Sequence, residues 1–323
     1  MAALPATGWI PHHVQMPASF PQPSDADLAT TRDVLSRLPR GGVALMDGLA
    51  FGALPRELID SFDLKYVALV HHPLAQETGL HADDVERLMT SERAALGAAS
   101  AIVATSRHTA DQLMRDYAVP EGKLRVAFPG TKPAPRAMPQ NTSPCLLTVA
   151  TLTHRKGHDV LIRALAVLKD LHWHSVLVGS LDRAPAVTAN IRALMAAEGL
   201  EQRVTLCGEM DEHELDTVYA GADVFVLPSR HEGYGMAFAE ALARGLPIVA
   251  GAAGAVIDTV PADAGLLVPS DDPMALAQAL RRILTDHDLR RTLSDAAWTH
   301  GHRLPTWDDT AAAVSTALRS ALS

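Results

Sequence analysis

Two glutamates that lie eight residues apart, Glu232 and Glu240, flank a turn rich in glycine. An apolar run at 222–227 precedes the turn, and an alanine-rich segment of helical length follows it. A strand that passes through a glycine turn into a helix directs backbone N–H groups and the positive end of the helix dipole towards an anion. The carboxylates beside that anion need hydroxyl groups from which to accept hydrogen bonds. The pattern therefore predicts a ligand that is both an anion and a polyol, as a sugar nucleotide is.

A second group of charges lies at the start of another predicted helix. Arg155 and Lys156 stand between the apolar run 146–150 and the helical segment 156–170. Near the N-terminus of that helix, Lys156 is a candidate to meet a pyrophosphate as a point charge. Arg155 is its neighbour and a candidate to share that role. A solvated lysine at a helix start is the alternative interpretation.

The segment around the two glutamates resembles a known family. It reads Ala-Asp-Val-Phe-Val-Leu-Pro-Ser-Arg-His-Glu-Gly-Tyr-Gly from Ala222, and it is similar to the E-x7-E motif of the family-4 glycosyltransferases, which are retaining enzymes of the GT-B fold. Two glutamates at this spacing arise often by chance, but the surrounding pattern is far more restrictive. The segments 149–165, 204–215 and 229–284 match the donor half of that family in order. In the alternative interpretation, the two glutamates bind no ligand: Glu232 lies on a solvated loop and Glu240 on the outer face of a helix.

The resemblance implies roles for the residues of this half. Glu240 would accept hydrogen bonds from the ribose hydroxyls, and Glu232 from hydroxyls of the transferred sugar. Gly233 and Gly235 would let the backbone approach the ligand. The remaining donor-site candidates contribute mainly through the backbone or through charge: Gly208 and Glu209 beside the nucleobase, Met236 and Ala237 at the sugar or diphosphate, and Arg155 and Lys156 at the phosphates. Many relatives carry an arginine five positions before the lysine, where this chain has Thr151.

The other half of the chain offers a histidine pair. His71 and His72 follow the apolar run 66–70, and in relatives a histidine at this edge lines the cleft near the anomeric carbon and the acceptor. His71 is the better match and His72 the alternative. Asp47 and Glu77 are weaker candidates for the acceptor side, since turns and helix caps use the same residue types.

Apolar runs alternate with segments of helical length throughout the chain, which favours parallel sheets covered on both faces. The expected strands are 43–46, 66–70, 101–104, 124–128, 146–150, 175–178, 204–207, 224–227, 248–250 and 265–268. The expected helices are 83–98, 107–117, 156–170, 188–198, 211–220, 237–244, 273–284 and about 306–321. The fold class expected is α/β: a GT-B pair of doubly wound, Rossmann-like domains that face a cleft.

The proline-rich stretch 129–139 predicts a linker between two domains. Residues 1–135 would form an acceptor-side domain together with a C-terminal helix, 304–323, that packs back on it. Residues 140–303 would form the donor-binding domain. Relatives begin with a strand and a Gly-rich loop, which are not expected in this sequence, and residues 9–16 are expected to be the second strand.

Composition narrows the function classes. The net charge of −9, without a cluster of Lys and Arg, makes a nucleic-acid partner unlikely. No run approaches the roughly 20 apolar residues of a membrane span, although peripheral membrane contact stays possible. The start of the chain is no convincing signal peptide, and the two cysteines are expected to be free thiols, so a cytoplasmic location is expected. No Cys/His cluster has zinc spacing. The D-x-D pairs at Asp25 and Asp286 are interpreted as solvated charge, so no metal and no cofactor are expected.

The function expected is retaining transfer of a hexose from a UDP- or GDP-sugar to an acceptor hydroxyl, in the synthesis of a polysaccharide, glycolipid or glycoconjugate. His71, Glu232 and Lys156 are the expected catalytic residues. Two alternatives stay open: a scaffold protein of the same fold that binds sugar nucleotide without transferring it, and a nucleotide-sugar epimerase. The sequence leaves open the sugar, the base, the acceptor and the oligomeric state.

Overall fold

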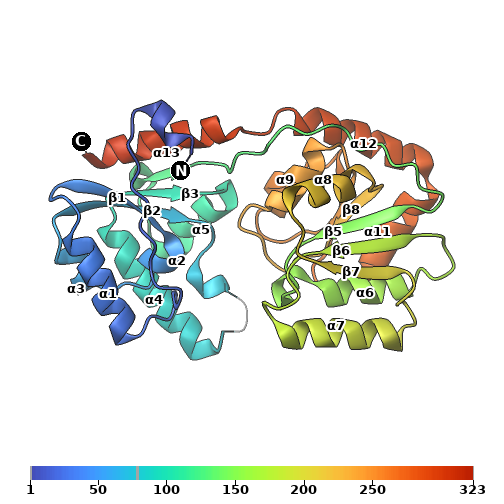
Figure 1. The fold of residues 1–323 in the computed structure, drawn as a ribbon, viewed down its shortest axis with the longest axis horizontal. Coiled ribbons are helices and arrows are strands. Elements are labelled where there is room, and N and C mark those ends of the chain that lie inside the picture. Colours follow the sequence, from blue (N-terminus) through green and yellow to red (C-terminus); the bar gives the residue numbers. More distant parts are fainter. Residues whose placement is uncertain (1, 78–79, 323) are drawn as a thin grey trace. The chain divides into compact units, whose positions relative to one another are not determined.

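The computed structural model of the chain describes residues 2–77 and 80–322 (Figure 1). The chain forms two compact units, one of residues 1–130 with 305–323 and one of residues 131–304. The boundary after Gly130 falls inside the proline-rich stretch 129–139. Among the described residues, no helix combines the length and apolar character that crossing a membrane requires.

The first unit contains a parallel sheet in the order β1-β2-β3-β4. Its strands are β1 (Gly42–Asp47), β2 (Leu64–Val70), β3 (Ala101–Ala104) and β4 (Leu124–Val126). One face packs against α1 (Asp25–Ser36), α2 (Gly48–Phe51), α3 (Arg56–Asp60), α4 (Ala82–Ala98) and α5 (Arg107–Tyr117). The other face packs against η1 (Leu4–Thr7) and the C-terminal helix α13 (Trp307–Leu322), as predicted (Figure 1). Short 3-10 turns, η2 (Leu74–Gln76) and η3 (Glu121–Lys123), follow β2 and precede β4.

The second unit contains a parallel sheet of six strands in the order β10-β9-β8-β5-β6-β7. Its strands are β5 (Cys145–Val149), β6 (His174–Val178), β7 (Val204–Gly208), β8 (Val224–Leu227), β9 (Ile248–Gly251) and β10 (Gly265–Val268). Its helices are η4 (His154–Lys156), α6 (His158–Ala166), α7 (Pro185–Ala197), α8 (Glu212–Ala220), α9 (Met236–Ala243), α10 (Val256–Thr259), α11 (Pro273–Thr285) and α12 (His287–Gly301). The strand order reverses between β5 and β8, and doubly wound sheets bind ligands at such a switch point, outside the carboxyl ends of the strands.

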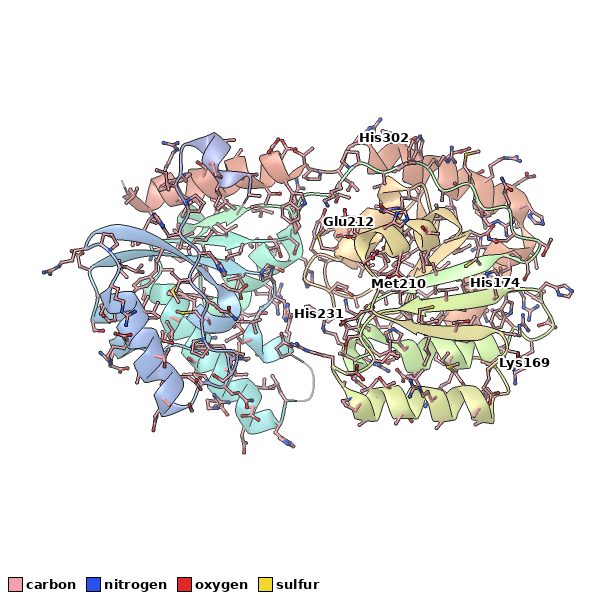
Figure 2. All side chains as sticks on the ribbon, viewed as in Figure 1. Lys169, His174, Met210, Glu212, His231 and His302 are labelled. Carbon is pink, nitrogen blue, oxygen red and sulfur yellow. The ribbon has the colours of Figure 1, made fainter. Side chains whose placement is uncertain are left out.

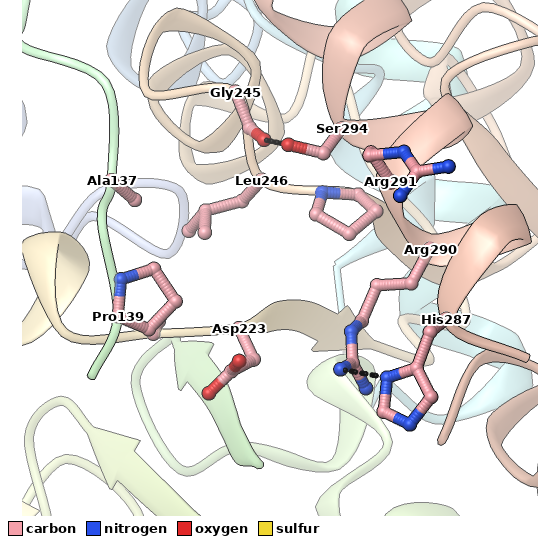
Figure 3. Close-up of a pocket in the computed structure, with 11 residues that line it drawn as sticks. Ala137, Pro139, Asp223, Gly245, Leu246, His287, Arg290, Arg291 and Ser294 are labelled. Carbon is pink, nitrogen blue, oxygen red and sulfur yellow. Dashed lines mark hydrogen bonds between the residues drawn. The ribbon is translucent and has the colours of Figure 1, made fainter. Parts of the chain in front are cut away.

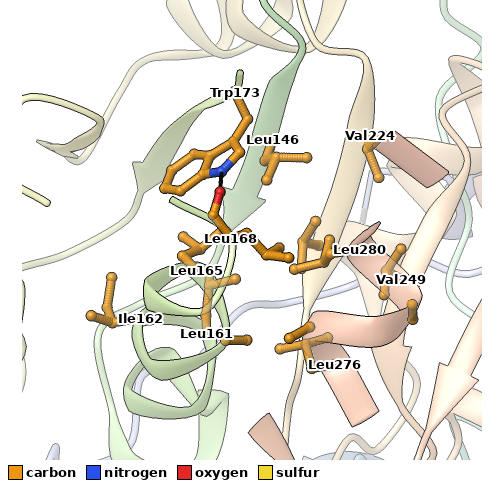
Figure 4. Close-up of a cluster of buried hydrophobic side chains, with 14 of the residues drawn as sticks. Leu146, Leu161, Ile162, Leu165, Leu168, Trp173, Val224, Val249, Leu276 and Leu280 are labelled. Atoms are coloured by element: carbon orange, nitrogen blue, oxygen red, sulfur yellow. Dashed lines mark hydrogen bonds between the residues drawn. The ribbon is translucent and has the colours of Figure 1, made fainter. Parts of the chain in front are cut away.

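Aliphatic side chains fill the core on one face of the second sheet. Leucines and isoleucines of α6 and α11 pack against Leu146 and Val224 of the sheet (Figure 4). Trp173 closes one end of this cluster, and its indole N–H donates to the backbone oxygen of Leu168 at 2.7 Å, so its polar atom is satisfied. On the other face Phe225 of β8 meets Phe238 of α9 edge-on, at 5.6 Å between ring centroids. The fully covered strands explain their near-continuous apolar sequences.

The structure confirms ten of the eleven expected strands to within a few residues. It contradicts the strand expected at residues 9–16, which lie in irregular structure. Pro11 and Pro17 lack the N–H that a strand must donate, and Trp9 donates its indole N–H to Ser315 of α13 at 3.0 Å. Among the described residues, five α-helices were not predicted: α1, α2, α3, α10 and α12.

The two D-x-D pairs lie at helix starts, and Asp25, Asp286 and Asp288 are exposed there. Asp27 forms a capping box with Ser24 at the start of α1, and Asp286 caps α12 by accepting from the backbone N–H of Leu289. Both pairs therefore have a local structural role.

Candidate functional site

Two helices begin side by side at the switch point of the second sheet. The neighbouring strands β5 and β8 lead through short turns into α6 and α9. Each helix follows a glycine with positive φ, Gly157 at +68° and Gly235 at +91°, and in neither case does a side chain cap the first turn. The first N–H groups of both helices therefore stay available for an external acceptor at the carboxyl edge.

Close packing of the backbone around these turns explains the glycines. A Cβ on Gly157 would lie 2.1 Å from the backbone oxygen of Pro228, so the turn after β5 touches the end of β8 directly. A Cβ on Gly235 would lie 2.6 Å from the ring of Phe238. The two turns are thus locked against each other and against the core below.

Replacing Gly157 with alanine is expected to cost at least about 3 kcal/mol of unfolding free energy, because left-handed strain of roughly 1–2 kcal/mol adds to the collision with Pro228. Gly199→Ala is the matched control, since Gly199 has a similar φ of +62° and open space around it. That variant should show the strain alone. Urea unfolding monitored by circular dichroism measures both, and equal losses would contradict the packing argument.

The charged residues predicted at this edge meet around one buried carboxylate. The Nζ of Lys156 lies 2.7 Å from Oε1 of Glu232, and a guanidinium nitrogen of Arg155 lies 3.5 Å from Oε2. The hydroxyl of Ser229 donates to Oε1 at 2.6 Å. Glu232 is only 4% exposed, so these donors replace its hydration.

The pKa shifts of Glu232 and Lys156 bear on whether these two side chains are charged. Burial alone would raise the pKa of Glu232, but the charge and hydrogen bond of Lys156, the Ser229 hydroxyl and the charge of Arg155 together lower it. Burial also lowers the pKa of Lys156, while Glu232 opposes that shift. We take the pair to be ionised at neutral pH, because each charge favours its partner's charged form. With Arg155, the group carries a net charge of +1 and suits an anion.

A separate ion pair ties the two turns together. Arg230 makes two hydrogen bonds to Asp159 in the first turn of α6, at 3.0 and 2.9 Å, and a third to Asp271 at 2.6 Å. Such a bidentate guanidinium–carboxylate pair is among the stronger polar contacts of proteins. It holds the segment after β8, which carries Glu232, against the start of α6.

Glu240 lies further along α9, above a buried tyrosine. One carboxylate oxygen, Oε2, accepts from the hydroxyl of Tyr219 at 3.1 Å. The guanidinium of Arg244 stacks over the Tyr219 ring at 4.4 Å from its centroid. Burial raises the pKa of Glu240, while Tyr219 and Arg244 lower it in part.

The other donor-site candidates lie at the same edge of the sheet. Gly233 is buried, and Met236 and Ala237 form the partly exposed first turn of α9. Gly208 ends β7, and Glu209, which follows it, is exposed. Figure 2 shows the same edge, with His231 after β8 and Met210 after β7, whereas His174 begins β6 at the amino edge.

In the first unit, the predicted histidines pair with the predicted acids. Nε2 of His71, after β2, lies 3.2 Å from Asp47, the last residue of the neighbouring β1. Asp47 also caps α2 by accepting from the N–H of Leu49 at 2.9 Å. Nε2 of His72 lies 2.6 Å from Glu77. The four side chains therefore form two pairs at the carboxyl edge of the first sheet.

The described part of the chain contains no group of three or more His, Cys, Asp or Glu side chains arranged to hold a metal ion. Cys145 and Cys207 are free thiols, and burial raises the pKa of both.

A cavity of about 220 Å³ opens at the opposite, amino edge of the second sheet. Asp223, which precedes β8, lines one side, and Arg290, His287 and Ser294 of α12 line another (Figure 3). Pro247, which precedes β9, also lines the cavity. It lies at the end of β8 remote from Glu232 and is separate from the site described above.

Sequence reasoning missed several residues around the site. Ser229 and Tyr219 orient the two glutamates, yet neither stands out by type. Neither ring nitrogen of His158, buried in the first turn of α6, has a hydrogen-bond partner among the described residues, and burial beside Lys156 lowers its pKa to about 4. Glu92 interrupts the apolar stripe of α4 between Leu88 and Leu96, a signal that was readable.

Known proteins share this architecture. The chain is 25% identical to sucrose-phosphate synthase from Thermosynechococcus elongatus, with a TM-score of 0.81 over 98% of this chain and 90% of that one. HepE from Anabaena, solved with UDP and glucose, is 18% identical with a TM-score of 0.77, over 91% of this chain and 81% of that one.

Curated relatives are similar in sequence over part of their length. The D-inositol 3-phosphate glycosyltransferase of Xylanimonas cellulosilytica is 31% identical over 77% of this chain, and that of Corynebacterium diphtheriae 28% identical over 76%. The chain spans 65% and 63% of the length of these two relatives. The family described as glycosyl transferases group 1 matches residues 135–299, more than half of the chain. The chain belongs to the group 1 glycosyltransferase family and has the GT-B fold.

Proposed function

We propose that the chain transfers a hexose from a nucleoside-diphosphate sugar to an acceptor hydroxyl, with retention at the anomeric carbon. The observation that carries this proposal is the pair of uncapped helix N-termini at the switch point, beside Lys156, Arg155 and Glu232. An anion suits the helix starts, and a polyol suits the carboxylates.

The diphosphate would lie across the starts of α6 and α9. An ammonium group has three donors, so Lys156 keeps donors for a phosphate while it holds Glu232. The first N–H groups of α9, at Met236 and Ala237, would bind the sugar or the diphosphate. The ribose would reach Glu240, where one oxygen already accepts from Tyr219 and the other would accept from a ribose hydroxyl.

During transfer, the bond between the anomeric carbon and the departing phosphate oxygen breaks, and the acceptor oxygen bonds to the same carbon. Charge grows on that phosphate, and Lys156, Arg155 and the start of α9 would stabilise it. The acceptor's proton would pass to the departing phosphate, because the acceptor approaches the face that this group leaves. His71, paired with Asp47, would line the acceptor side from the first unit. This route involves no covalent enzyme intermediate and no metal.

Relatives support the class of substrate. The HepE structure contains UDP and glucose, which favours a UDP-sugar as donor. The curated relatives are named for transfer to an inositol phosphate, but their acceptor is not carried over to this chain. Two free thiols support a reducing, cytoplasmic location.

Glu240→Gln is expected to weaken UDP binding about 10-fold to 100-fold, because a hydrogen bond to a charged group contributes roughly 1.5–3 kcal/mol. Glutamine still accepts from Tyr219, so folding should be retained. Glu212→Gln is the matched control, since Glu212 lies exposed on α8 and pairs with Lys132. Isothermal titration calorimetry with UDP measures both variants, and unchanged affinity in Glu240→Gln would show that the ribose lies elsewhere.

A product assay with UDP- and GDP-sugars completes the test. Formation of a new glycosidic bond with retained configuration is the expected result. Tight donor binding without breakdown would instead identify a sugar-nucleotide-binding scaffold. Conversion of donor to its epimer without any acceptor would identify an epimerase.

A further inference from the structure

Glu92 is a carboxylate buried in the core of the first unit. It is 0% exposed on α4, where it lies one turn after Leu88 and one turn before Leu96, both of which are buried as well. Glutamate is almost never fully buried unless it is paired, because burial disfavours its charge. No lysine, arginine or histidine pairs with Glu92 among the described residues. The burial of this carboxylate therefore costs folding free energy.

Glu92 contacts the loop that follows β2 through a hydrogen bond to its backbone. Oε2 of Glu92 accepts from the backbone N–H of Leu74 at 2.9 Å, and Leu74 begins η2, which packs directly on α4. Two residues before Leu74 is His72, and three residues after it is Glu77. The carboxylate therefore holds the loop 71–77 through its backbone. This loop carries His71, His72 and Glu77, three of the four side chains that form pairs at the carboxyl edge of the first sheet.

The surroundings of Glu92 leave its charge poorly balanced. Oε1 has no hydrogen-bond partner among the described residues. Tyr117 of α5 is the titratable group that faces it, while Arg56 and Asp60 of α3 pair with each other at the surface. The η2 turn itself contributes no titratable side chain, and its flanking residues His72 and Glu77 pair with each other. Burial outweighs the bonds from Leu74 and Tyr117 and raises the pKa of Glu92 to about 7.

We propose that Glu92 is a positioning residue whose protonation sets how firmly the loop 71–77 is held, and with it the placement of His71 and His72. Its relevance to the acceptor rests on the proposed function, but the coupling between Glu92 and the loop does not. An ionised carboxylate makes a charge-assisted bond to Leu74, roughly twice as strong as the bond that the neutral acid makes. Ionisation therefore strengthens this one bond above neutral pH, although the buried charge lowers the stability of the fold as a whole.

The amide proton of Leu74 reports this bond directly. In the full-length chain labelled with ¹⁵N-leucine, this proton should shift with pH and show a midpoint near 7, because its acceptor gains a charge. In Glu92→Gln the acceptor oxygen stays but the titration should vanish. Glu86→Gln, an exposed position on the same helix, is the matched control and should titrate like the wild type.

A Leu74 amide that is insensitive to pH in the wild type would overturn the proposal, and so would an identical titration in Glu92→Gln. The wild-type measurement decides this even if the variant fails to fold. It needs no turnover, so it stands or falls independently of the proposed transfer reaction. Where transfer is detected, Glu92→Gln should also remove the inflection near pH 7 from kcat/KM for the acceptor and leave UDP affinity unchanged; loss of UDP affinity would contradict a role confined to the first unit.

Discussion

Lys156→Met is expected to abolish measurable UDP binding and to lower the free energy of unfolding by about 3–5 kcal/mol, since it leaves the buried Glu232 carboxylate without its main partner. The loss of binding follows because one of two positive side chains at the diphosphate disappears. Isothermal titration calorimetry and urea unfolding measure the two effects on the same preparation. Lys169→Met is the control, since Lys169 lies half-exposed and pairs only with Glu198.

The double variant Lys156→Met/Glu232→Gln separates the two effects. Glutamine carries no charge, so most of the lost stability should return, while UDP binding should stay absent. Glu232→Gln alone raises the net charge of the group from +1 to +2, so UDP should bind at least as tightly as in the wild type. Full UDP affinity in Lys156→Met would show that the diphosphate is not bound at this edge.

The stability of the chain is expected to carry a signature of Glu92 near neutral pH. The folded pKa of this side chain is raised to about 7 from its ordinary value of 4.5. Between pH 4.5 and 7 the carboxyl group of Glu92 is ionised in the unfolded chain but still protonated in the folded chain. Its contribution to the free energy of unfolding is therefore fully present below pH 4.5 and is lost as the pH rises through 7. The shift corresponds to about 3 kcal/mol.

Comparison of the wild type with Glu92→Gln isolates this contribution. The pKa of His158 is lowered from its ordinary value of 6.5 to about 4. Its contribution to folding stability is therefore lost as the pH falls through this range, which is the opposite trend to that of Glu92. The difference in unfolding free energy between wild type and variant removes that background. It should move by about 3 kcal/mol in favour of the variant between pH 4.5 and 8. A difference that stays constant over this range would show that Glu92 is ionised in the fold throughout.

The strands were predictable because each is an apolar run covered on both faces, and the edge that collects the site follows from their parallel order. The strand expected at residues 9–16 failed because the order of elements in relatives suggested it, although Pro11 interrupts the segment. Helix α1 was not predicted, although the sequence contains Ser24 and Asp27, which form its capping box.

The candidate site could be assembled only in part. Glu232 and Lys156 were assigned to different portions of the ligand, yet they meet at 2.7 Å across 76 positions of sequence. Spacing along the chain does not specify such a contact, since it depends on how the turns after β5 and β8 pack. The role of Tyr219 under Glu240 has the same origin, because α8 and α9 are separated by a strand.

The C-terminal helix has a consequence for synthesis. Residues 131–304 form a continuous unit inserted into another unit, whose element α13 is synthesised after them. Val314 and Leu318 of that helix cover a face of the first sheet, and a Cβ on Gly130 would touch the backbone of Trp307. A nascent chain leaves the ribosome at roughly 5–20 residues per second. Residues 131–304 have therefore all been synthesised before α13 is available to cover the first sheet. The half that is translated first is therefore the half that finishes folding last.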